Sequence, residues 1–427
     1  MAVVTLDLGE GEGVRIFGPA GVEVEEGLVT ILGAELSQGD RVDIGEYRSY
    51  LAKALKPARL RVSMSGRARV EIPGNGEEPL EEWIHIADKI LQECGRECTA
   101  VVMGPVEAGK TSLTAVLANR SLARGIPTGI IDADIGQADI GPPGFVSLSL
   151  PGSWVIWLRL LEPVALRFVG SIEPGPVAGR VVTAVASLRA RARREGAAFV
   201  AVDTDGWVRG WGALEYKIDL ARGVNADAVV VVGDPELYSF LQKSLESSVY
   251  YVRSPSVQAV RRVEDRRRLR SENYIRFLEG GEREVSLKSV KIQGACIGGA
   301  PFEDERLKSS IESQLGSPVK LMTRYPGGVC IVVDAERQVE PHEIKGAARK
   351  IAGGEVIVVS RGSMKGVLAA LVDEEGVEHP ALLLDVDLDS MKARFKTRFQ
   401  GEVKKVIFGR VKLGEEYYEE IRGRILV

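Results

Sequence analysis

The chain has 427 residues and a formal charge of −4, from 56 basic and 60 acidic residues. This length is enough for two or three domains with their own cores. The near-neutral charge excludes a basic field over the whole molecule, so any contact with nucleic acid must come from a local patch. No apolar run approaches the ~20 residues that a membrane-spanning helix needs, so no contact with a membrane is expected.

The residue pattern predicts three domains in chain order. Residues 1–78 show short strand patterns broken by glycines, which predict a small β sandwich or barrel. Residues 79–285 alternate continuous apolar strands with helical patterns, which indicates an α/β domain built on a parallel sheet. Residues 286–427 are mostly strands, with helical patches at 304–315 and 340–351, and predict a mixed, β-rich domain.

Cysteine usage bears on compartment and on metal binding. The chain has four cysteines, at Cys94, Cys98, Cys296 and Cys330. The spacing of the first two suits one helix face better than a zinc knuckle, so no metal site is expected there. We interpret all four as free thiols, which fits a reducing cytoplasm. The acidic start of the chain has no apolar signal-peptide core, which also favours a cytoplasmic protein.

The segment "VVMGPVEAGKTSL" carries the strongest signal. It contains Gly104-x-x-x-x-Gly109-Lys110-Thr111 between a strand pattern and a helix pattern, the context that a phosphate-binding loop requires. Its backbone N–H groups and the helix N-terminus can converge on phosphates. We expect Lys110 to reach the β- and γ-phosphates of ATP, GTP or another nucleoside triphosphate, and Thr111 to ligate Mg²⁺. The predicted nucleotide-binding residues are Gly104, Pro105, Val106, Glu107, Ala108, Gly109, Lys110, Thr111 and Ser112.

Two aspartates end the next predicted strand, in "IIDADIGQADIGPPG". Because side chains alternate along a strand, Asp132 and Asp134 lie on the same side and can both face the phosphate loop. We assign Asp132 to the magnesium shell and Asp134 to general-base work beyond the γ-phosphate. The alternative for either one is a helix or turn cap. A GTPase Asp-x-x-Gly-Gln run does not fit, because Asp134 is one residue too close to Gly136.

"DADIGQ" resembles the D-x-D-x-G-Q motif of the polynucleotide 5′-hydroxyl kinase family, whose members act in RNA processing. Other segments match in order. They are "FVGSIEPG" (168–175), "TDGW" (204–207), which is similar to the family's T-x-G-W clasp, and "VKKVIFGRVKLG" (403–414). The resemblance implies an archaeal-type kinase that transfers a γ-phosphate to the 5′-hydroxyl end of RNA or DNA, with Asp134 as the base. Gln137 would then orient the substrate.

The clasp and an arginine-rich segment supply the expected contacts to nucleic acid. Thr204, Gly206 and Trp207 form the clasp, whose indole can stack on a base. A core position is the alternative for Trp207, and we expect the core for Trp211.

Residues 253–276 hold eight arginines and three acidic residues. Arg266 and Arg270 match the family's R-x-x-x-R lid and lie on one helix face, where both could clamp the transferred phosphoryl group. Arg262 with Arg266 also fits the spacing. We expect Arg253 and Arg261 to contact substrate phosphates, and a solvated basic helix is the alternative.

Three other functions compete with this reading. A GTPase is disfavoured, because no Asn-Lys-x-Asp or Thr-Lys-x-Asp motif is present. A small-molecule kinase needs neither a clasp tryptophan nor an arginine-rich segment. A scaffold subunit that binds a nucleotide without turnover, within an RNA-processing assembly of protein partners, remains the main alternative.

Overall fold

The computed structural model describes residues 2–74, 76–257, 261–337, 339 and 352–422. By its internal contacts the chain forms two compact units. The first unites residues 1–141, 146–165 and 174–266, and the second unites residues 142–145, 166–173 and 267–427. The predicted three-domain division, with boundaries at residues 78 and 285, stays a prediction.

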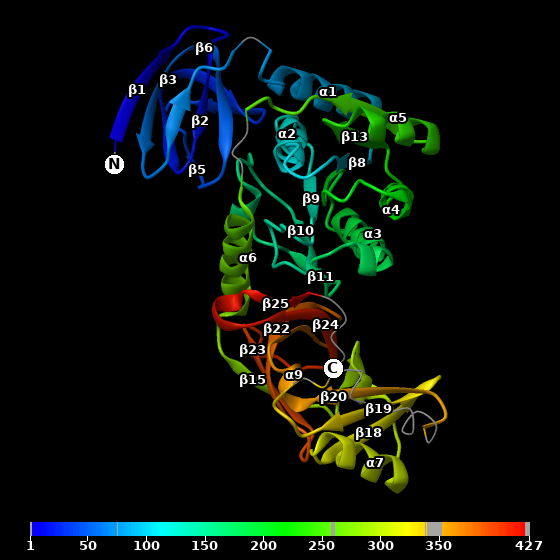
Figure 1. The fold of residues 1–427 in the computed structure, drawn as a ribbon. Helices are drawn as coiled ribbons and strands as arrows, with labels where there is room; N and C mark the ends of the chain where they lie inside the picture. The colour runs from blue at the N-terminus through cyan, green and yellow to red at the C-terminus, as the bar shows by residue number, and fades with distance from the viewer. Residues whose placement is uncertain (1, 75, 258–260, 338, 340–351, 423–427) are drawn as a thin grey trace. The chain divides into compact units, whose positions relative to one another are not determined.

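The chain begins with an antiparallel sheet, drawn in blue in Figure 1. The long strands β3 and β6 pair along most of their length, and β1 and β2 also pair with β6. Buried and partly exposed residues alternate in the first half of β3, so one of its faces packs into the core. The strands are β1 (Ala2–Leu8), β2 (Gly13–Phe17), β3 (Ala20–Ile31), β4 (Ala34–Ser37), β5 (Arg41–Ile44), β6 (Ser49–Met64) and β7 (Arg69–Glu71).

A second sheet, which we call the central sheet, has the strand order β11-β10-β9-β12-β8-β13-β14. Strands β9, β12, β8, β13 and β14 run parallel, and β10 pairs antiparallel to β9. Every residue of β8, β9 and β12 is buried, which explains their continuous apolar sequences. The strands are β8 (Cys98–Met103), β9 (Thr128–Ala133), β10 (Phe145–Ser149), β11 (Ala165–Phe168), β12 (Phe199–Thr204), β13 (Ala228–Val232) and β14 (Ser248–Val252).

The helices that accompany this sheet follow the predicted alternation of strand and helix (Figure 1). They are α1 (Leu80–Glu93), α2 (Lys110–Leu122), α3 (Ala178–Arg194), α4 (Trp211–Gly223) and α5 (Pro235–Ser244), with the short 3₁₀ turns η1 (Leu158–Leu160) and η2 (Gly175–Val177). The predicted helix near 80–91 and the predicted helix at 178–194 are both present. The α/β fold class with a P-loop domain is confirmed.

Helix α6 (Val263–Leu278) leads into the carboxyl-terminal part of the chain, which contains two sheets. The larger has the order β15-β23-β22-β21-β24-β16, and the smaller has the order β17-β18-β19-β20. The predicted helix near 304–315 is α7, whereas the one predicted at 340–351 lies outside the described residues. The elements are β15 (Glu282–Ser286), β16 (Lys291–Gln293), η3 (Cys296–Gly298), β17 (Ala300–Pro301), α7 (Glu305–Leu315), β18 (Val319–Tyr325), β19 (Gly328–Val333), β20 (Glu355–Ser360), α9 (Arg361–Met364), β21 (Val367–Val372), β22 (Glu378–Asp387), β23 (Lys392–Thr397), β24 (Lys405–Leu413), η5 (Glu415–Tyr417) and β25 (Glu419–Arg422).

The interpretation of the four cysteines as free thiols is wrong, because the structure pairs all of them. Helix α1 ends at Glu93, and Cys94 is already extended, so Cys94 and Cys98 do not share a helix face. Their Cα atoms lie 5.5 Å apart, and those of Cys296 and Cys330 lie 5.8 Å apart, both within disulfide range. The cysteines therefore no longer support a reducing compartment, and cytoplasmic localisation stays a prediction.

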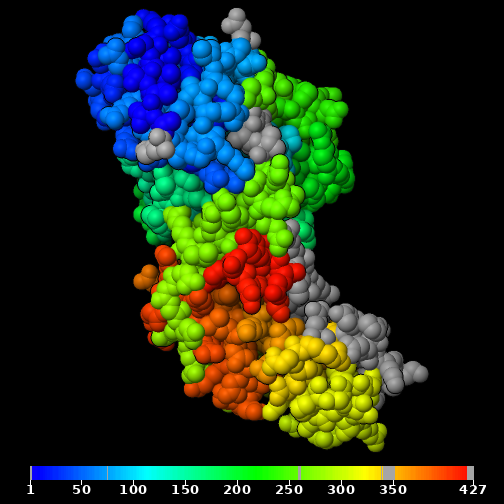
Figure 2. Space-filling view, turned by 60° about the vertical axis from the view of Figure 1, so that its left-hand side comes forward, coloured from blue at the N-terminus to red at the C-terminus, as the bar shows by residue number. Residues whose placement is uncertain are grey.

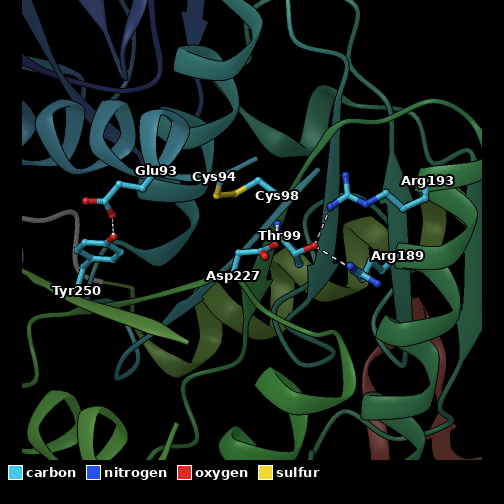
Figure 3. The surroundings of a disulfide bond; sticks show 8 residues. All are labelled: Glu93, Cys94, Cys98, Thr99, Arg189, Arg193, Asp227 and Tyr250. Carbon is cyan, nitrogen blue, oxygen red and sulfur yellow. Dashed lines mark hydrogen bonds between the residues drawn. A yellow bond between two sulfur atoms is a disulfide. The ribbon is translucent and has the colours of Figure 1, made fainter. Parts of the chain in front are cut away.

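Figure 3 shows what surrounds the first disulfide. The hydroxyl of Tyr250 donates a hydrogen bond to Glu93, next to Cys94. On the other side of the bridge, Thr99 accepts hydrogen bonds on its hydroxyl from Arg189 (3.0 Å) and Arg193 (2.9 Å). The bridge thus joins the end of α1 to the first strand of the central sheet, directly before the phosphate loop. Among the described helices, none is long and apolar enough to cross a membrane.

Candidate active site

The phosphate loop connects β8 to α2, as the sequence predicts. Gly104 and Gly109 have φ values of 153° and 104°, which favour glycine strongly. A Cβ on Gly104 would also lie 2.6 Å from the carbonyl oxygen of Val232 on the neighbouring strand. Lys110 is largely buried, and its ammonium donates a hydrogen bond to the carbonyl of Pro105 (2.9 Å). The lysine is therefore folded over its own loop, where phosphate oxygens could replace that carbonyl.

The two aspartates of "DADIGQ" have different surroundings. Asp132 is buried and accepts three backbone hydrogen bonds, from Asp134 (3.1 Å), Asp139 (2.7 Å) and Ile140 (2.9 Å). Burial, together with the charge of Asp203, raises the pKa of Asp132 well above its usual value. The carboxylate of Asp132 therefore stabilises the loop that follows β9. This role is structural more than metal-binding.

Asp134 is presented differently. Its Oδ1 accepts hydrogen bonds from the backbone of Gly136 (3.2 Å) and Gln137 (2.9 Å). Its Oδ2 accepts no hydrogen bond from the described residues. Burial raises the pKa of Asp134 and the charge of Lys110 lowers it, so the carboxylate lies in the electrostatic field of the phosphate-loop lysine. One oxygen is thus fixed by the backbone, and the other is left for a substrate hydroxyl.

Asp203, which the sequence reasoning missed, lies beside Thr111. It is the last residue but one of β12, the strand hydrogen-bonded directly to the phosphate-loop strand β8. A hydrogen bond from the Thr111 side chain and the charge of Lys110 lower its pKa, but burial outweighs both and raises the pKa to about 7. The Oδ1 atom of Asp203 is buried without a hydrogen-bond partner among the described residues. A signal existed in the sequence, since Asp203 starts an Asp-x-x-Gly run at the end of an apolar strand.

The clasp segment packs directly on the phosphate loop. A Cβ on Gly206 would lie 2.7 Å from the backbone nitrogen of Val106, so only glycine allows this approach. The Thr204 hydroxyl donates a hydrogen bond to the carbonyl of Val102 on β8 (2.8 Å). The T-x-G-W segment is therefore brought to the nucleotide-binding loop.

A buried ion pair holds the clasp turn in shape, and sequence reasoning also missed it. The carboxylate of Asp205 accepts hydrogen bonds from the backbone of Trp207 (2.9 Å) and from the hydroxyl of Tyr216 (2.7 Å). Lys217, on α4 and fully buried, lies 3.2 Å from Asp205 and donates to the Thr204 hydroxyl (3.2 Å). A lysine buried without a partner would be costly, so Lys217 and Asp205 must be kept together.

The two tryptophans of "TDGWVRGWG" are placed differently from each other. Trp207 is half-buried and stacks on Tyr216, with ring centroids 5.8 Å apart. The prediction that Trp211 lies in the core is wrong, because 66% of it is exposed. Trp211 is the first residue of α4, and its ring makes an edge contact with Phe240. Its position at the start of a helix leaves this apolar side chain exposed.

We expect Trp207→Ala to weaken oligonucleotide binding by about 1–3 kcal/mol, because base stacking on an indole has that magnitude. Fluorescence anisotropy with a labelled oligonucleotide measures the effect. Trp211→Ala is the matched control, since it removes an indole four residues away from the clasp. A large drop in melting temperature with unchanged oligonucleotide affinity would show that Trp207 serves only the core.

The two lid arginines do not share one environment. Both lie on α6 with the predicted helical spacing, but Arg270 is buried and its guanidinium donates two hydrogen bonds to Glu419, at 2.6 and 3.1 Å. Arg266 is half-buried at the end of the first compact unit, whereas Arg270 belongs to the second. Arg270 therefore has a structural partner, and the lid role of Arg266 stays a prediction.

Three other arginines of this segment have different surroundings. Arg253 is exposed and pairs with Glu82 of α1 (2.8 Å). Arg262 is exposed, and its backbone donates to the carboxylate of Asp265 at the start of α6 (2.9 Å). Arg261 lies instead among charged groups of the first unit, where burial lowers its pKa to about 10.

A small cavity lies between the amino-terminal sheet and the phosphate loop. Figure 2 shows the blue amino-terminal sheet in contact with the P-loop part of the same unit. Trp83 of α1 packs close to Gly109, where an added Cβ would lie 2.9 Å from its ring. Arg15 donates two hydrogen bonds to Glu78 and two to Ser49, one to its hydroxyl (2.8 Å) and one to its carbonyl (3.2 Å). The cavity is lined by Arg15, Leu32, Ser49, Tyr50, Leu51, Glu78, Pro79, Leu80, Trp83, Ser112 and Pro255.

Comparison with known proteins shows which proteins have a similar segment. Residues 104–280 match the family model described as the mRNA cleavage and polyadenylation factor CLP1 P-loop. This segment of the chain is similar to the CLP1 P-loop family. The matched residues run from the first glycine of the phosphate loop to the end of α6, so they contain the aspartates, the clasp and the lid. The resemblance to polynucleotide 5′-hydroxyl kinases is confirmed.

Relatives and solved structures extend the match beyond the CLP1 P-loop segment. A polyribonucleotide 5′-hydroxyl-kinase of Thermococcus kodakarensis is 28% identical over 325 residues, which cover 74% of this chain and 89% of that protein. The polyribonucleotide 5′-hydroxyl-kinase Clp1 of Danio rerio is 23% identical over 407 residues, covering 87% and 90%. The structure of Clp1p in complex with Pcf11p superimposes with a TM-score of 0.61 at 14% identity, covering 96% of this chain and 98% of that one. The last comparison supports the fold.

Proposed function

We propose that the protein is a polynucleotide 5′-hydroxyl kinase that transfers the γ-phosphate of ATP or another nucleoside triphosphate to the 5′-hydroxyl of RNA. The observation that carries the proposal is the free oxygen of Asp134 beside Lys110, in a segment similar to the CLP1 P-loop family. The names of the relatives support RNA as the acceptor, and DNA remains a second acceptor to be tested.

The reaction follows from the charges of the site. Oδ2 of Asp134 accepts the proton of the 5′-hydroxyl while the new O–P bond forms and the bond between the β-oxygen and the γ-phosphorus breaks. Only partial proton transfer is needed in a loose transition state, so a carboxylate is a sufficient base. Lys110 neutralises the phosphate charge, and an arginine from α6, for which we propose Arg266, stabilises the transferred group.

The residues present fit Mg²⁺. In P-loop enzymes its protein ligands are the loop Ser or Thr and an aspartate, and when bound it would neutralise the charge that develops on the transferred phosphate. Thr111 and Asp203 supply that pair here, and the unpartnered Oδ1 of Asp203 leaves an acceptor for a cation. Within the described residues there is no group of three or more acidic, histidine or cysteine side chains that could hold a metal by itself. We therefore propose Thr111 with Asp203, in place of Thr111 with Asp132.

We expect Asp203→Asn to raise the Mg²⁺ concentration that gives half-maximal activity by about 10-fold or more. Loss of an outer-shell partner of a metal ligand already has an effect of this size, and loss of a direct ligand should have at least as large an effect. Titration of Mg²⁺ at saturating nucleotide measures it. Asp132→Asn is the matched comparison, and it should lower the melting temperature more than the Mg²⁺ affinity. If Asp132→Asn shifted the Mg²⁺ titration and Asp203→Asn did not, the original assignment of Asp132 would hold.

We also propose that the amino-terminal sheet contacts the nucleotide base, since the small cavity lined by Arg15, Trp83 and Ser112 joins that sheet to the phosphate loop. Gln137 would orient the acceptor hydroxyl. In the structure its side chain donates to the carbonyl of Gly136 (3.0 Å), directly beside Asp134. Protein partners are proposed as well, because a fold relative was solved in a complex with Pcf11p.

The test is to incubate the protein with ATP, Mg²⁺ and an oligoribonucleotide that carries a 5′-hydroxyl, and to identify the product by mass spectrometry. A 5′-phosphorylated oligonucleotide of the same sequence is the control and should remain unchanged. Tight ATP binding with no phosphorylated product, for RNA and DNA alike, would instead identify a nucleotide-binding scaffold.

A further inference from the structure

Trp83, in the first turn of α1, packs against the last glycine of the phosphate loop. The tryptophan is buried, with 3% of its surface exposed. Gly109 has a φ of 104° and directly precedes α2. A Cβ on Gly109 would lie 2.9 Å from Cη2 of Trp83 and 3.4 Å from Cδ of Pro255. The face of Gly109 from which a side chain would project is therefore covered by two rings, which come from distant segments of the chain.

A hydrogen bond of its own fixes the orientation of the Trp83 indole. Its Nε1 donates to the carbonyl of Arg253 (2.9 Å), in the segment that follows β14. Arg253 is held in turn by Glu82, which accepts hydrogen bonds from the backbone of Arg253 (3.1 Å) and from Nε of its guanidinium (2.8 Å). Because Glu82 and Trp83 are neighbours on α1, the helix and the segment after β14 are joined at two adjacent points.

Gly109 decides where the first N–H groups of α2 point. These groups, from Lys110 onward, form the end of the helix that can bind an anion. Gly109 is the N-cap residue of α2, and its carbonyl accepts a hydrogen bond from the backbone of Leu113 (2.9 Å). As a glycine it offers neither a capping side chain nor a restriction on its own backbone. Packing by Trp83 and Pro255 restricts this residue from outside the loop.

We propose that Trp83 is a positioning residue for the phosphate loop. It keeps Gly109 in the backbone conformation in which the N–H groups at the start of α2 face the phosphates of the nucleotide. The inference rests on the proposed function, because it takes the ligand of the loop to be a nucleoside triphosphate. Trp83 also lines the small cavity between the amino-terminal sheet and the phosphate loop. Direct contact with the nucleotide base is therefore the alternative that the experiment must separate.

The test compares ligands with and without a base. Trp83→Phe removes the indole N–H and shortens the ring that reaches Gly109. Displacement of a fluorescent ATP analogue measures the affinities of ATP, CTP and inorganic tripolyphosphate. We expect Trp83→Phe to weaken all three by a similar factor of about 5-fold, which corresponds to the loss of one hydrogen bond of ordinary strength. A loss confined to the two nucleotides, with tripolyphosphate unaffected, would overturn the proposal and assign Trp83 to the base.

Amide hydrogen exchange of the ligand-free protein gives a second readout. We expect the amide of Leu113 and those of the phosphate loop to exchange about 5-fold faster in Trp83→Phe, because the ring restricts the loop before any ligand binds. Exchange at the native rate would contradict the proposal. This measurement needs neither a nucleotide nor phosphoryl transfer. It therefore distinguishes failure of this inference from failure of the proposed kinase function.

Trp157→Phe is the matched control. Trp157 also packs on a glycine, since a Cβ on Gly45 would lie 2.6 Å from Cη2 of its ring, but Gly45 belongs to the turn between β5 and β6. Trp157→Phe should cost stability without changing the three affinities or the exchange of the phosphate loop. If Trp83→Phe likewise lowered only the melting temperature, Trp83 would serve the core alone and the proposal would be wrong.

Pro255→Ala keeps the test usable if Trp83→Phe does not fold. This change removes the second ring at Gly109 and lies on a half-buried residue. It should weaken the three ligands together and speed the exchange of the phosphate loop, in the same direction as Trp83→Phe. Native affinities and native exchange in Pro255→Ala would count against external packing as the restraint on Gly109.

Discussion

Asp134→Asn is expected to lower kcat by about 10²- to 10⁴-fold, the range that general-base catalysis contributes. The asparagine keeps the size of the side chain, and its oxygen can still accept the hydrogen bonds from Gly136 and Gln137. The change therefore removes the proton acceptor and leaves the loop in place. Nucleotide affinity should fall little, because neither backbone contact to Asp134 involves the phosphate loop.

Steady-state kinetics with a 5′-hydroxyl oligonucleotide, together with nucleotide binding measured by calorimetry, checks this result. Lys110→Ala is the comparison, since it removes charge neutralisation and should weaken nucleotide binding as well as turnover. If Asp134→Asn mainly abolished nucleotide binding while kcat stayed near normal, Asp134 would belong to the metal and not to the acceptor.

Arg266→Ala is expected to lower kcat and kcat/KM together by about 10²-fold or more, a cautious value below the range for arginine fingers. An arginine used only in the transition state gives this pattern, because ground-state binding never depended on it. Arg270→Ala should behave differently. It removes the guanidinium that pairs with the buried Glu419 and should cost about 3 kcal/mol or more in unfolding free energy.

Kinetics at two salt concentrations and thermal melts of both variants separate the two roles. Arg262→Ala is the control for the register of the lid, since Arg262 lies one helical turn before Arg266 and is exposed. A kcat defect in Arg262→Ala without one in Arg266→Ala would move the lid one turn earlier. A kcat defect in Arg270→Ala at unchanged stability would restore the pair inferred from the R-x-x-x-R spacing.

The parts of the site that depend on local sequence were predictable. The phosphate loop needs glycines, a lysine and a threonine at fixed spacing, so Gly104 to Thr111 could be read directly. The central strands were readable for the same reason, because strands covered on both faces are continuously apolar. The order of strands in the sheet is not local. Nothing in the sequence alone says that β12 and not β9 lies next to β8. The assignment of Asp132 as the metal ligand depended on that order, and Asp203 was missed for the same reason.

Long-range pairings account for the other differences. Arg270 looks like a lid residue by spacing, but its partner Glu419 lies 149 residues away and cannot be inferred from the helix alone. The arginines that act on Asp139 likewise come from three separate segments, as Arg48, Arg159 and Arg261. Trp211 and the cysteines were mispredicted for a local reason. Both were interpreted from residue type and spacing, but Trp211 lies at the start of a helix and Cys94 lies just beyond the end of one.

The fate of the γ-phosphate tests the central claim most directly. With γ-labelled ATP, Mg²⁺ and excess 5′-hydroxyl oligoribonucleotide, we expect the label to appear at the 5′ end of the oligonucleotide faster than in inorganic phosphate, and Asp134→Asn to abolish that transfer. Release of the label only as inorganic phosphate, at a rate that the oligonucleotide does not change, would contradict the account and identify Asp134 as part of a hydrolase.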